Sequence, residues 1–242
     1  SGAPSVSSRA FGFSRSYLEG CLLAYQVVLE GDFSSLSPAI KAAFLPDLPH
    51  EVMPGYSWIF PRDEATANVG VGCFRPGEGR FPVDLKGLLQ DVLRREGLAG
   101  APVLRRGGGL IPGRVLPRLA YGNLLLAGDA AGLTSPLHGG GMDMACLSGA
   151  LAVQAIAQGP SGTEGYRERL LDCIREKEAM EAIMIRKLRT LDFAGLDRLL
   201  KAAAVPEPLI RARAALEHGD LLLASWRWLR RRQKGLPPLA GG

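Results

Sequence analysis

The sequence is poor in the residues that build metal and redox sites. Only four cysteines and three histidines occur in 242 residues. No two cysteines have the spacing of a zinc ligand pair or a redox pair. The four are Cys21, Cys73, Cys146 and Cys173. We therefore expect unpaired, mostly buried thiols, a reducing compartment and no metal site.

The sequence also lacks any long uncharged apolar stretch. A membrane-spanning helix needs about 20 such residues, and residues 1–15 do not have the layout of a signal peptide. A hydrophobic fraction of 47% with 22% charged residues is typical of a folded globular chain. We expect a cytoplasmic protein. Because the chain begins at Ser1 without a methionine, we also expect it to be part of something longer.

Several catalytic signatures are missing. The sequence contains no GxSxG, no HExxH and no GxxxxGK[ST] motif, which disfavours common hydrolase and nucleoside triphosphatase functions. The dinucleotide-binding fingerprint GxGxxG is absent as well. Its nearest approach, residues 107–112, has proline where the third glycine belongs.

Periodicity separates the chain into a sheet-rich first half and a helical second half. Apolar runs between glycine and proline predict strands at 19–31, 56–61, 66–74, 103–110 and 123–127. Helical spacing predicts helices at 83–96, 140–158, 163–191, 195–217 and 219–233. The four residues 62–65 join two of the strands into a hairpin. The fold class that follows is α/β (α+β).

One segment has the composition of a site for a charged cofactor. The strand at 123–127 is followed by Gly128 and Asp129, where a carboxylate can accept hydrogen bonds from hydroxyl groups. The glycines at 139–141 then open a helix, whose accessible amides and dipole favour an anion or a polarised carbonyl. A tight glycine turn with a locally capping aspartate would give the same pattern.

The string GNLLLAGDAAGLTSPLHGGGM at 122–142, continued by Ala145 and by Ser148-Gly149, resembles a known motif. It is similar to the second flavin-binding motif of FAD-dependent oxidoreductases in the aromatic-hydroxylase and geranylgeranyl reductase superfamily. The resemblance implies FAD as cofactor, with the aspartate at its ribityl or pyrophosphate part and the glycines facing the isoalloxazine ring. The cofactor-binding residues that it implies are Gly128, Asp129, Ala130, Pro136, Gly139, Gly140, Gly141 and Met142.

A second string indicates one branch within this superfamily. Strand alternation places Tyr56, Trp58 and Phe60 on one face, where three aromatic rings can be core or can line a pocket. The string GYSWIFPR, followed by NVGVG at 68–72, resembles the YxWxFP signature of the geranylgeranyl reductase branch. That resemblance implies a pocket for a long apolar substrate, lined by these three residues and Pro61.

The resemblance implies an enzyme that reduces C=C bonds of a polyprenyl (geranylgeranyl) group on a lipid or pigment precursor. The electrons would come from NADPH or a reduced carrier. No catalytic residue can be assigned; Tyr56, Cys73 and His138 are candidate proton donors. Two alternatives stay open: a flavin monooxygenase, and a fragment or split subunit that binds no FAD alone and caps the substrate.

The resemblance covers the C-terminal portion of the family only. Residues 1–5 with Arg9 resemble the motif Asp-Gly-Ala-x-Ser-x-x-Arg, with Ser1 in place of aspartate and the arginine displaced. In the family, roughly one domain with the GxGxxG region precedes that motif. The expected domains are a partial FAD-binding domain (1–18 and 103–158), a substrate-binding domain with an antiparallel sheet (19–102) and a helical C-terminal region (159–242).

The net charge of +5 arises at the C-terminus, because no acidic residue follows Asp220. Five basic residues lie there: Arg227, Arg230, Arg231, Arg232 and Lys234. Nucleic-acid binding is not indicated, since such proteins spread basic residues over a face or motif. The pattern of apolar and basic residues in this segment predicts an amphipathic helix. Such a helix would lie either in a membrane interface or against the domain.

Overall fold

The computed structural model describes residues 3, 6–18, 20–45, 47–75 and 81–190. The chain divides into two compact units, Ser1–Cys173 and Ile174–Gly242, and each is treated by itself. The helices predicted at 195–217 and 219–233, and with them the basic C-terminal segment, lie outside the described residues. The domain limits expected from the sequence stay predictions.

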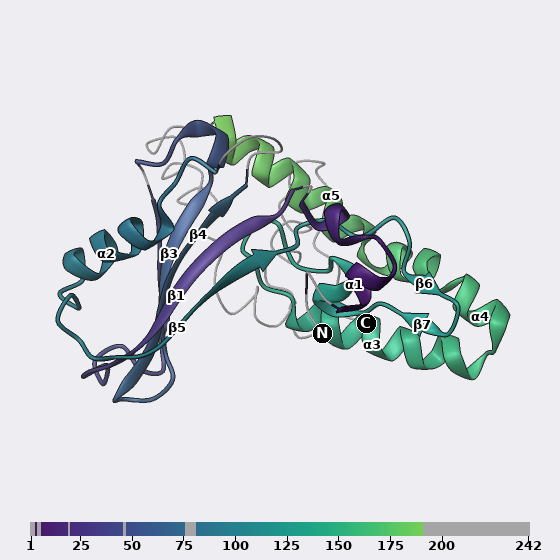
Figure 1. The fold of residues 1–242 in the computed structure, drawn as a ribbon, viewed down its shortest axis with the longest axis horizontal. Coiled ribbons are helices and arrows are strands. Elements are labelled where there is room, and N and C mark those ends of the chain that lie inside the picture. The colour runs from purple at the N-terminus through teal and green to yellow at the C-terminus, as the bar shows by residue number, and fades with distance from the viewer. Residues whose placement is uncertain (1–2, 4–5, 19, 46, 76–80, 191–242) are drawn as a thin grey trace, which may run out of the picture. The chain divides into compact units, whose positions relative to one another are not determined.

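A five-stranded sheet forms the first half of the first unit (Figure 1). Its strands are β1 (Leu22–Glu30), β2 (Lys41–Phe44), β3 (Gly55–Pro61), β4 (Thr66–Phe74) and β5 (Val103–Ile111). They lie in the order β2-β3-β4-β1-β5, and every neighbouring pair is antiparallel. The antiparallel sheet and four of its strands are confirmed. Strand β2 was not predicted, because the short sequence KAAF has weak strand propensity and takes its geometry from β3.

The predicted hairpin is confirmed, since β3 and β4 pair with Pro61 opposite Ala67. Its turn is held by Asp63, whose carboxylate accepts hydrogen bonds from the amides of Ala65 (2.9 Å) and Thr66 (2.6 Å). The hydroxyl of Thr66 donates to the same oxygen at 3.0 Å. These bonds hold the pKa of the Asp63 carboxyl below its usual range.

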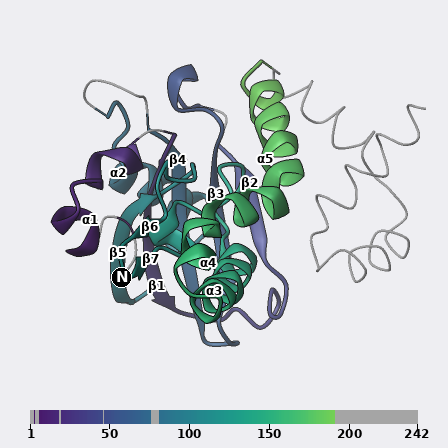
Figure 2. The same ribbon diagram turned by 90° about the vertical axis from the view of Figure 1, so that its right-hand side faces the viewer.

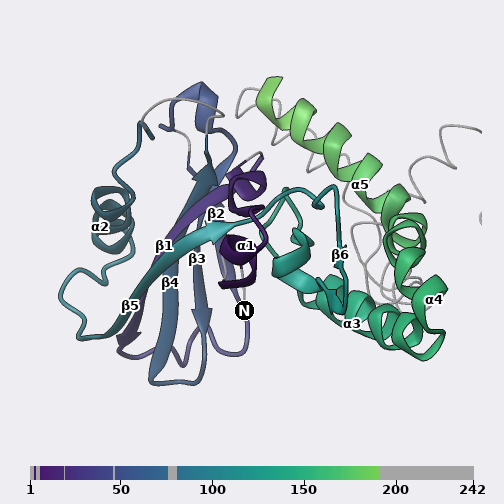
Figure 3. The same cartoon turned by 45° about the vertical axis from the view of Figure 1, so that its right-hand side comes forward.

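Helix α2 (Leu85–Arg95) lies on one face of the sheet and makes the main core there (Figure 3). The predicted helix at 83–96 is thereby confirmed. Asp84 caps its start by accepting the amide of Lys86 at 3.1 Å, and Gly97, with φ of 72°, follows its end. The buried core residues are Val27, Leu29, Phe33, Leu45, Ile59, Ala67, Val69, Val71, Leu89, Val92 and Leu93.

The strand predicted over 123–127 is only partly present. The elements after the sheet are β6 (Ala120–Tyr121), β7 (Leu124–Leu125), the 3-10 helix η3 (Gly128–Ala131), α3 (Met142–Ala157), α4 (Pro160–Glu164) and α5 (Tyr166–Thr190). Strand β7 keeps two residues because β6 is its one partner among the described residues. Helices α3 and α5 confirm two predicted helices, and α4 lies beside α3 (Figure 2).

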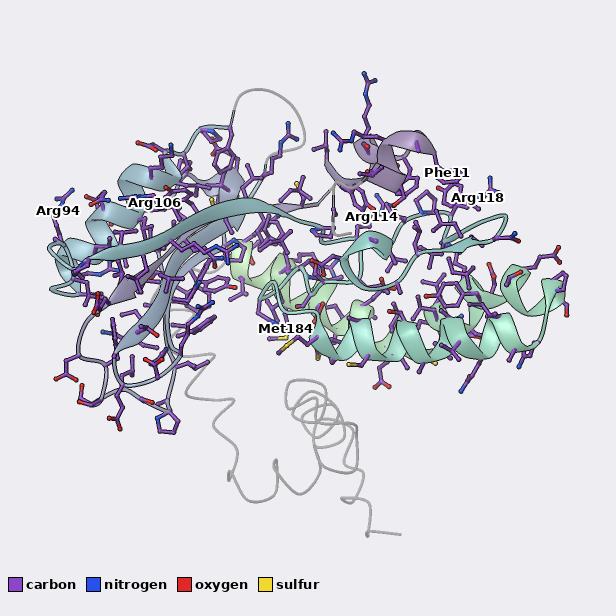
Figure 4. All side chains as sticks on the ribbon, turned by 60° about the horizontal axis from the view of Figure 1, so that its bottom comes forward. Phe11, Arg94, Arg106, Arg114, Arg118 and Met184 are labelled. Atoms are coloured by element: carbon purple, nitrogen blue, oxygen red, sulfur yellow. The ribbon has the colours of Figure 1, made fainter. Side chains whose placement is uncertain are left out.

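The N-terminal residues form two short elements that the sequence did not predict, α1 (Val6–Ala10) and the 3-10 helix η1 (Ser14–Leu18). A further 3-10 helix, η2, spans His50–Val52. The ring of Phe11 lies 5.2 Å from that of Tyr121 in β6, and the guanidinium of Arg118 lies 4.6 Å from the same ring (Figure 4). The ring contact attaches the residue after α1 to β6.

The cysteine prediction is confirmed for pairing and only half confirmed for burial. All four thiols are free, but Cys146 and Cys173 are exposed whereas Cys21 and Cys73 are buried. In the described part of the chain, no helix is long and apolar enough to cross a membrane. The same part holds no cluster of three side chains that could bind a metal ion.

The start of α5 is anchored by Tyr166, which is fully buried. Its hydroxyl lies 2.9 Å from the carbonyl oxygen of Leu126 and 3.2 Å from that of Ser148. Its one proton is therefore shared between an acceptor that follows β7 and an acceptor in α3. Leu170, one helical turn further on, is also fully buried, so the two side chains lie on one packing face of the helix.

Replacing Tyr166 by phenylalanine should lower the free energy of unfolding by about 1–3 kcal/mol, because two buried carbonyls lose their donor. Tyr25→Phe is the matched control, since the Tyr25 hydroxyl has no hydrogen bond within the described residues. Urea denaturation of both variants checks this. Equal stability of the two would show that the Tyr166 hydroxyl does not anchor the helix.

Candidate functional site

Tyr56, Trp58 and Phe60 form a row of rings on the sheet face opposite α2. They alternate along β3 with Ile59, which belongs to the core under α2. The ring centroids of Tyr56 and Trp58 are 5.6 Å apart, and those of Trp58 and Phe60 are 6.0 Å apart. The sequence prediction of a shared face is confirmed, and we call this face the aromatic face.

The indole of Trp58 lies flat over strand β4. A Cβ atom built on Gly70, the residue that pairs with Trp58, would stand 2.2 Å from indole atom Cζ2. The indole Nε1 donates a hydrogen bond to Oδ1 of Asn68 at 2.7 Å. Sequence reasoning quoted the NVGVG string but gave these two residues no role. The structure shows that the glycine makes room for the ring and the asparagine fixes its orientation.

The aromatic face continues over β1 and β5 with very small side chains. Ala24 pairs with Gly72 on one side and with Gly109 on the other. A Cβ built on Gly109 would meet no atom within 4 Å, and one on Gly107 would meet only the amide nitrogen of Gln26, at 3.9 Å. The surface beside the indole is therefore open backbone. The sequence predicted a strand at 103–110 but gave these glycines no role beside the rings.

Two of the three amides in the glycine turn at 139–141 donate hydrogen bonds to nearby residues. The amide of Gly139, which has φ of 70°, donates to the Ser135 carbonyl at 2.8 Å, and the amide of Gly140 donates to Nδ1 of His138 at 3.1 Å. Helical bonding in α3 begins with the amide of Ala145 on the Gly141 carbonyl. The N–H groups without a helical acceptor thus belong to the first turn, which begins at Met142.

One hydrogen bond joins the glycine turn to the aromatic face. The hydroxyl of Tyr56 donates to the carbonyl oxygen of His138, at 2.5 Å. A Cβ built on Gly139 would lie 3.5 Å from that hydroxyl and 3.5 Å from Cδ1 of Ile111. Burial raises the pKa of Tyr56, so the phenol keeps its proton at neutral pH. Because Nδ1 of His138 is an acceptor, the neutral imidazole carries its proton on Nε2.

Asp129 is exposed at the start of η3, directly after buried Gly128. Its carboxylate accepts no hydrogen bond from any residue in the described ranges. Hydrogen bonds hold the backbone on both sides of Asp129. The Gly128 amide donates to the hydroxyl of buried Ser148 at 3.0 Å, and the Tyr17 hydroxyl donates to the Ala130 carbonyl at 2.6 Å. The carboxylate is thus available for hydroxyl donors.

Other predicted residues lie elsewhere. Met142 is 87% exposed at the start of α3, and Pro136 is half-buried in the loop before it. Pro61 pairs with core residue Ala67, so it lies on the α2 side rather than with the three rings. Cys73 also lies on that side, because it alternates with Gly72, and burial raises its pKa to about 12. It does not meet the other two candidate proton donors, Tyr56 and His138.

No protein-family model matches the chain. Among curated proteins, it is 31% identical over 178 residues to digeranylgeranylglycerophospholipid reductase 1 of Methanopyrus kandleri, a match that covers 70% of this chain and 47% of that one. It is 31% identical over 145 residues to menaquinone reductase of Mycolicibacterium smegmatis, covering 58% and 35%. The chain spans about half or less of the length of these relatives.

Comparison with solved structures gives the same likeness. A geranylgeranyl bacteriochlorophyll reductase-like protein of Thermoplasma acidophilum superimposes with a TM-score of 0.62 at 26% identity, covering 75% of this chain and 46% of that one. The flavin-dependent brominase Bmp2, at 16% identity and a TM-score of 0.55 over 89% of this chain and 56% of its own, shares the fold. The likeness to the geranylgeranyl reductase branch and the α/β fold class are thus confirmed.

A methyl group on Gly70 should displace the Trp58 indole from its seat and break its bond to Asn68. We expect Gly70→Ala to lower the free energy of unfolding by about 1–3 kcal/mol, as overpacking does. Gly109→Ala places the same methyl group in open space on the same face and should change stability by less than about 0.5 kcal/mol. Thermal unfolding of both variants measures the difference; similar losses would contradict the seating of the indole.

Proposed function

We propose that the chain is the flavin-ring and substrate portion of an FAD-dependent oxidoreductase that reduces C=C bonds of a polyprenyl group. The hydrogen bond from Tyr56 to the His138 carbonyl carries this proposal. It places the row of aromatic rings directly beside the turn that opens α3, so an apolar chain on the sheet would reach a ring held at that turn. The reductases named above act, by name, on a digeranylgeranyl lipid and on menaquinone.

The residues at the turn suit FAD. The first turn of α3 offers N–H donors and lies at the positive end of the helix dipole. Both favour negative charge on the pyrimidine side of an isoalloxazine ring. The Asp129 carboxylate can accept from the hydroxyls of the ribityl arm. A Cβ on Gly141 would stand 2.9 Å from Cγ2 of Thr134, so the turn needs glycine to stay this close to its support. When bound and reduced, FAD supplies the hydride.

The aromatic face would bind the polyprenyl group. The indole of Trp58, which is 7% exposed and is fixed by Asn68, supports this surface from within, and Phe60 continues it with 36% of its surface exposed. Gly107 and Gly109 let an extended chain approach the sheet backbone. Since contacts of this kind are non-directional, they would hold several isoprene units without selecting one register. This is the surface that a long, repetitive substrate requires.

The proton that accompanies the hydride would come from near the turn. Tyr56 holds its phenolic proton against the His138 carbonyl, and the imidazole of His138 carries its own on Nε2. Either group, or a water molecule that they orient, can serve. We further propose NADPH or a reduced carrier as the electron source, and a peripheral membrane contact through the basic segment after Asp220.

A specific observation favours a second proposal, that this chain acts only within a larger assembly. Helix α3 is apolar on nearly all sides, yet Met142, Val153 and Ile156 are 87%, 68% and 63% exposed. An all-apolar helix of a soluble protein is normally buried. We propose that the remainder of the flavin-binding domain, on this polypeptide or another, covers α3 and holds the ADP part of FAD.

The first test follows the reaction. The chain is joined to the part of the Methanopyrus relative that it does not match, loaded with FAD, reduced, and given a geranylgeranyl lipid. We expect the product to gain two hydrogens per reduced bond by mass spectrometry. Oxygen uptake with a hydroxylated product would indicate a monooxygenase instead, and an unchanged lipid would contradict the proposal.

In the same assay, Tyr56→Phe should lower kcat/KM about tenfold, which corresponds to one hydrogen bond of roughly 1–2 kcal/mol. The Tyr25→Phe variant, which makes the same change on the opposite face, should retain activity. If the two variants behave alike, the bond between Tyr56 and His138 is not needed for the reaction.

A third test addresses the covering of α3. Cys146 on this helix and Cys173 on α5 are both exposed in the chain. We expect iodoacetamide to alkylate both in the isolated chain, and Cys146 to become protected after assembly with the complementing part. Peptide mass mapping gives the rates. Unchanged alkylation of Cys146 in an assembly that binds FAD would contradict the covering of this face.

A further inference from the structure

Asp129 belongs to η3, and every carbonyl of this short helix has a hydrogen-bond donor. Three of the carbonyls accept from backbone amides, at 3.0 or 3.1 Å. The fourth, that of Ala130, directly follows Asp129 in the chain and accepts from a side chain, the Tyr17 hydroxyl, at 2.6 Å. The support of η3 is therefore completed by a residue of the N-terminal segment.

The ring of Tyr17 is itself held in place by its neighbours. It is 1% exposed and lies edge-on to the ring of Phe13, with 5.9 Å between the two centroids. The ring of Phe13 in turn stacks on that of Tyr121 in β6, at 5.1 Å. The Tyr17 hydroxyl thus reaches η3 from a fixed direction, although 113 positions separate it from Ala130 in the sequence.

The two ends of η3 are fixed by close backbone contacts. A Cβ atom built on Gly128, which has φ of 54°, would lie 3.2 Å from Cβ of Ala145 in α3. One built on Gly132, which has φ of 80°, would lie 2.0 Å from the carbonyl oxygen of Arg114. Between these ends, the bond from Tyr17 holds the residue next to Asp129. The direction of the Asp129 carboxylate therefore depends on this bond.

The electrostatics of Tyr17 agree with a carboxylate nearby. Burial raises the pKa of Tyr17 to about 12, and charge interactions with Tyr121 and Asp129 add to the rise. The phenol therefore keeps its proton at neutral pH and remains a donor to the Ala130 carbonyl. The Asp129 carboxylate, which accepts no hydrogen bond in the described ranges, stays available for a ligand.

We propose that Tyr17 is a positioning residue for Asp129, and that it makes the site select flavins with a hydroxylated arm. Tyr17 acts through the backbone: it holds the Ala130 carbonyl, and the exposed Asp129 carboxylate is thereby directed toward the hydroxyls of a ribityl arm. The inference rests on the proposed function. It adds a residue that no motif in the sequence indicated.

Two free flavins test this role on the chain as it is. Riboflavin carries the isoalloxazine ring with a ribityl arm, whereas lumiflavin carries a methyl group in place of the arm. We expect the wild-type chain to bind riboflavin more tightly than lumiflavin. Tyr17→Phe should weaken riboflavin binding roughly three- to tenfold, the range of one hydrogen bond, and leave lumiflavin binding unchanged. Quenching of flavin fluorescence gives the dissociation constants.

Two further variants separate positioning from a general loss of structure. In an Asp129→Ala background, Tyr17→Phe should have no additional effect on riboflavin, because the carboxylate through which it acts is gone. Tyr25→Phe, the same change at a hydroxyl without a hydrogen bond in the described ranges, should bind both flavins as the wild type does. Equal weakening of both flavins by Tyr17→Phe, or no weakening, would overturn this inference and leave the proposed function intact.

If Tyr17→Phe does not fold, amide spectra of the wild-type chain decide. Riboflavin, but not lumiflavin, should shift the amide signals of residues 128–131. Identical shifts from the two flavins would overturn the role of Tyr17 and still support a ring site at the start of α3. Binding of neither flavin would contradict the proposed function and, with it, this inference.

Discussion

The hydrogen bond from the Tyr56 hydroxyl to the His138 carbonyl joins the two parts from which the candidate site is built. One part is a sheet whose face opposite α2 is aromatic and glycine-rich; the other is a turn that opens helix α3. Each has its own support, since α2 packs behind the sheet and Ser148 holds the segment before the turn. The bond fixes the position of the row of rings relative to the turn before α3.

Sequence patterns predicted the elements well where local physics decides them. Period-two alternation gave β3 and β4, and helical spacing with a capping residue gave α2. They failed where tertiary partners decide: β2 exists because β3 pairs with it, and β7 is short because few partners are present. The strand register assigns each side chain to one of the two faces of the sheet. It places Trp58 on one face and Cys73 and Pro61 on the other, whereas the resemblance had grouped Pro61 with the rings.

The site is harder to predict than the fold, because side-chain partners are not local in sequence. The resemblance pointed to Gly139, Gly140 and Gly141 as the residues that face the flavin. The structure shows the amides of the first two bonded to Ser135 and His138, which leaves Gly141 and the first turn of α3 to supply the donors. Gly70 and Asn68 support the indole through a cross-strand pairing that no motif encodes. Motif resemblance identified the segment, and hydrogen-bond geometry identified the atoms.

We propose that an isoalloxazine ring binds between the start of α3 and Tyr56. NMR titration of the isotope-labelled chain with riboflavin, which carries the ring and ribityl arm without ADP, tests this binding. We expect amide shifts concentrated at Met142, Met144 and the residues around Tyr56, with none along α2. Shifts scattered over the surface, or confined to α2, would contradict it.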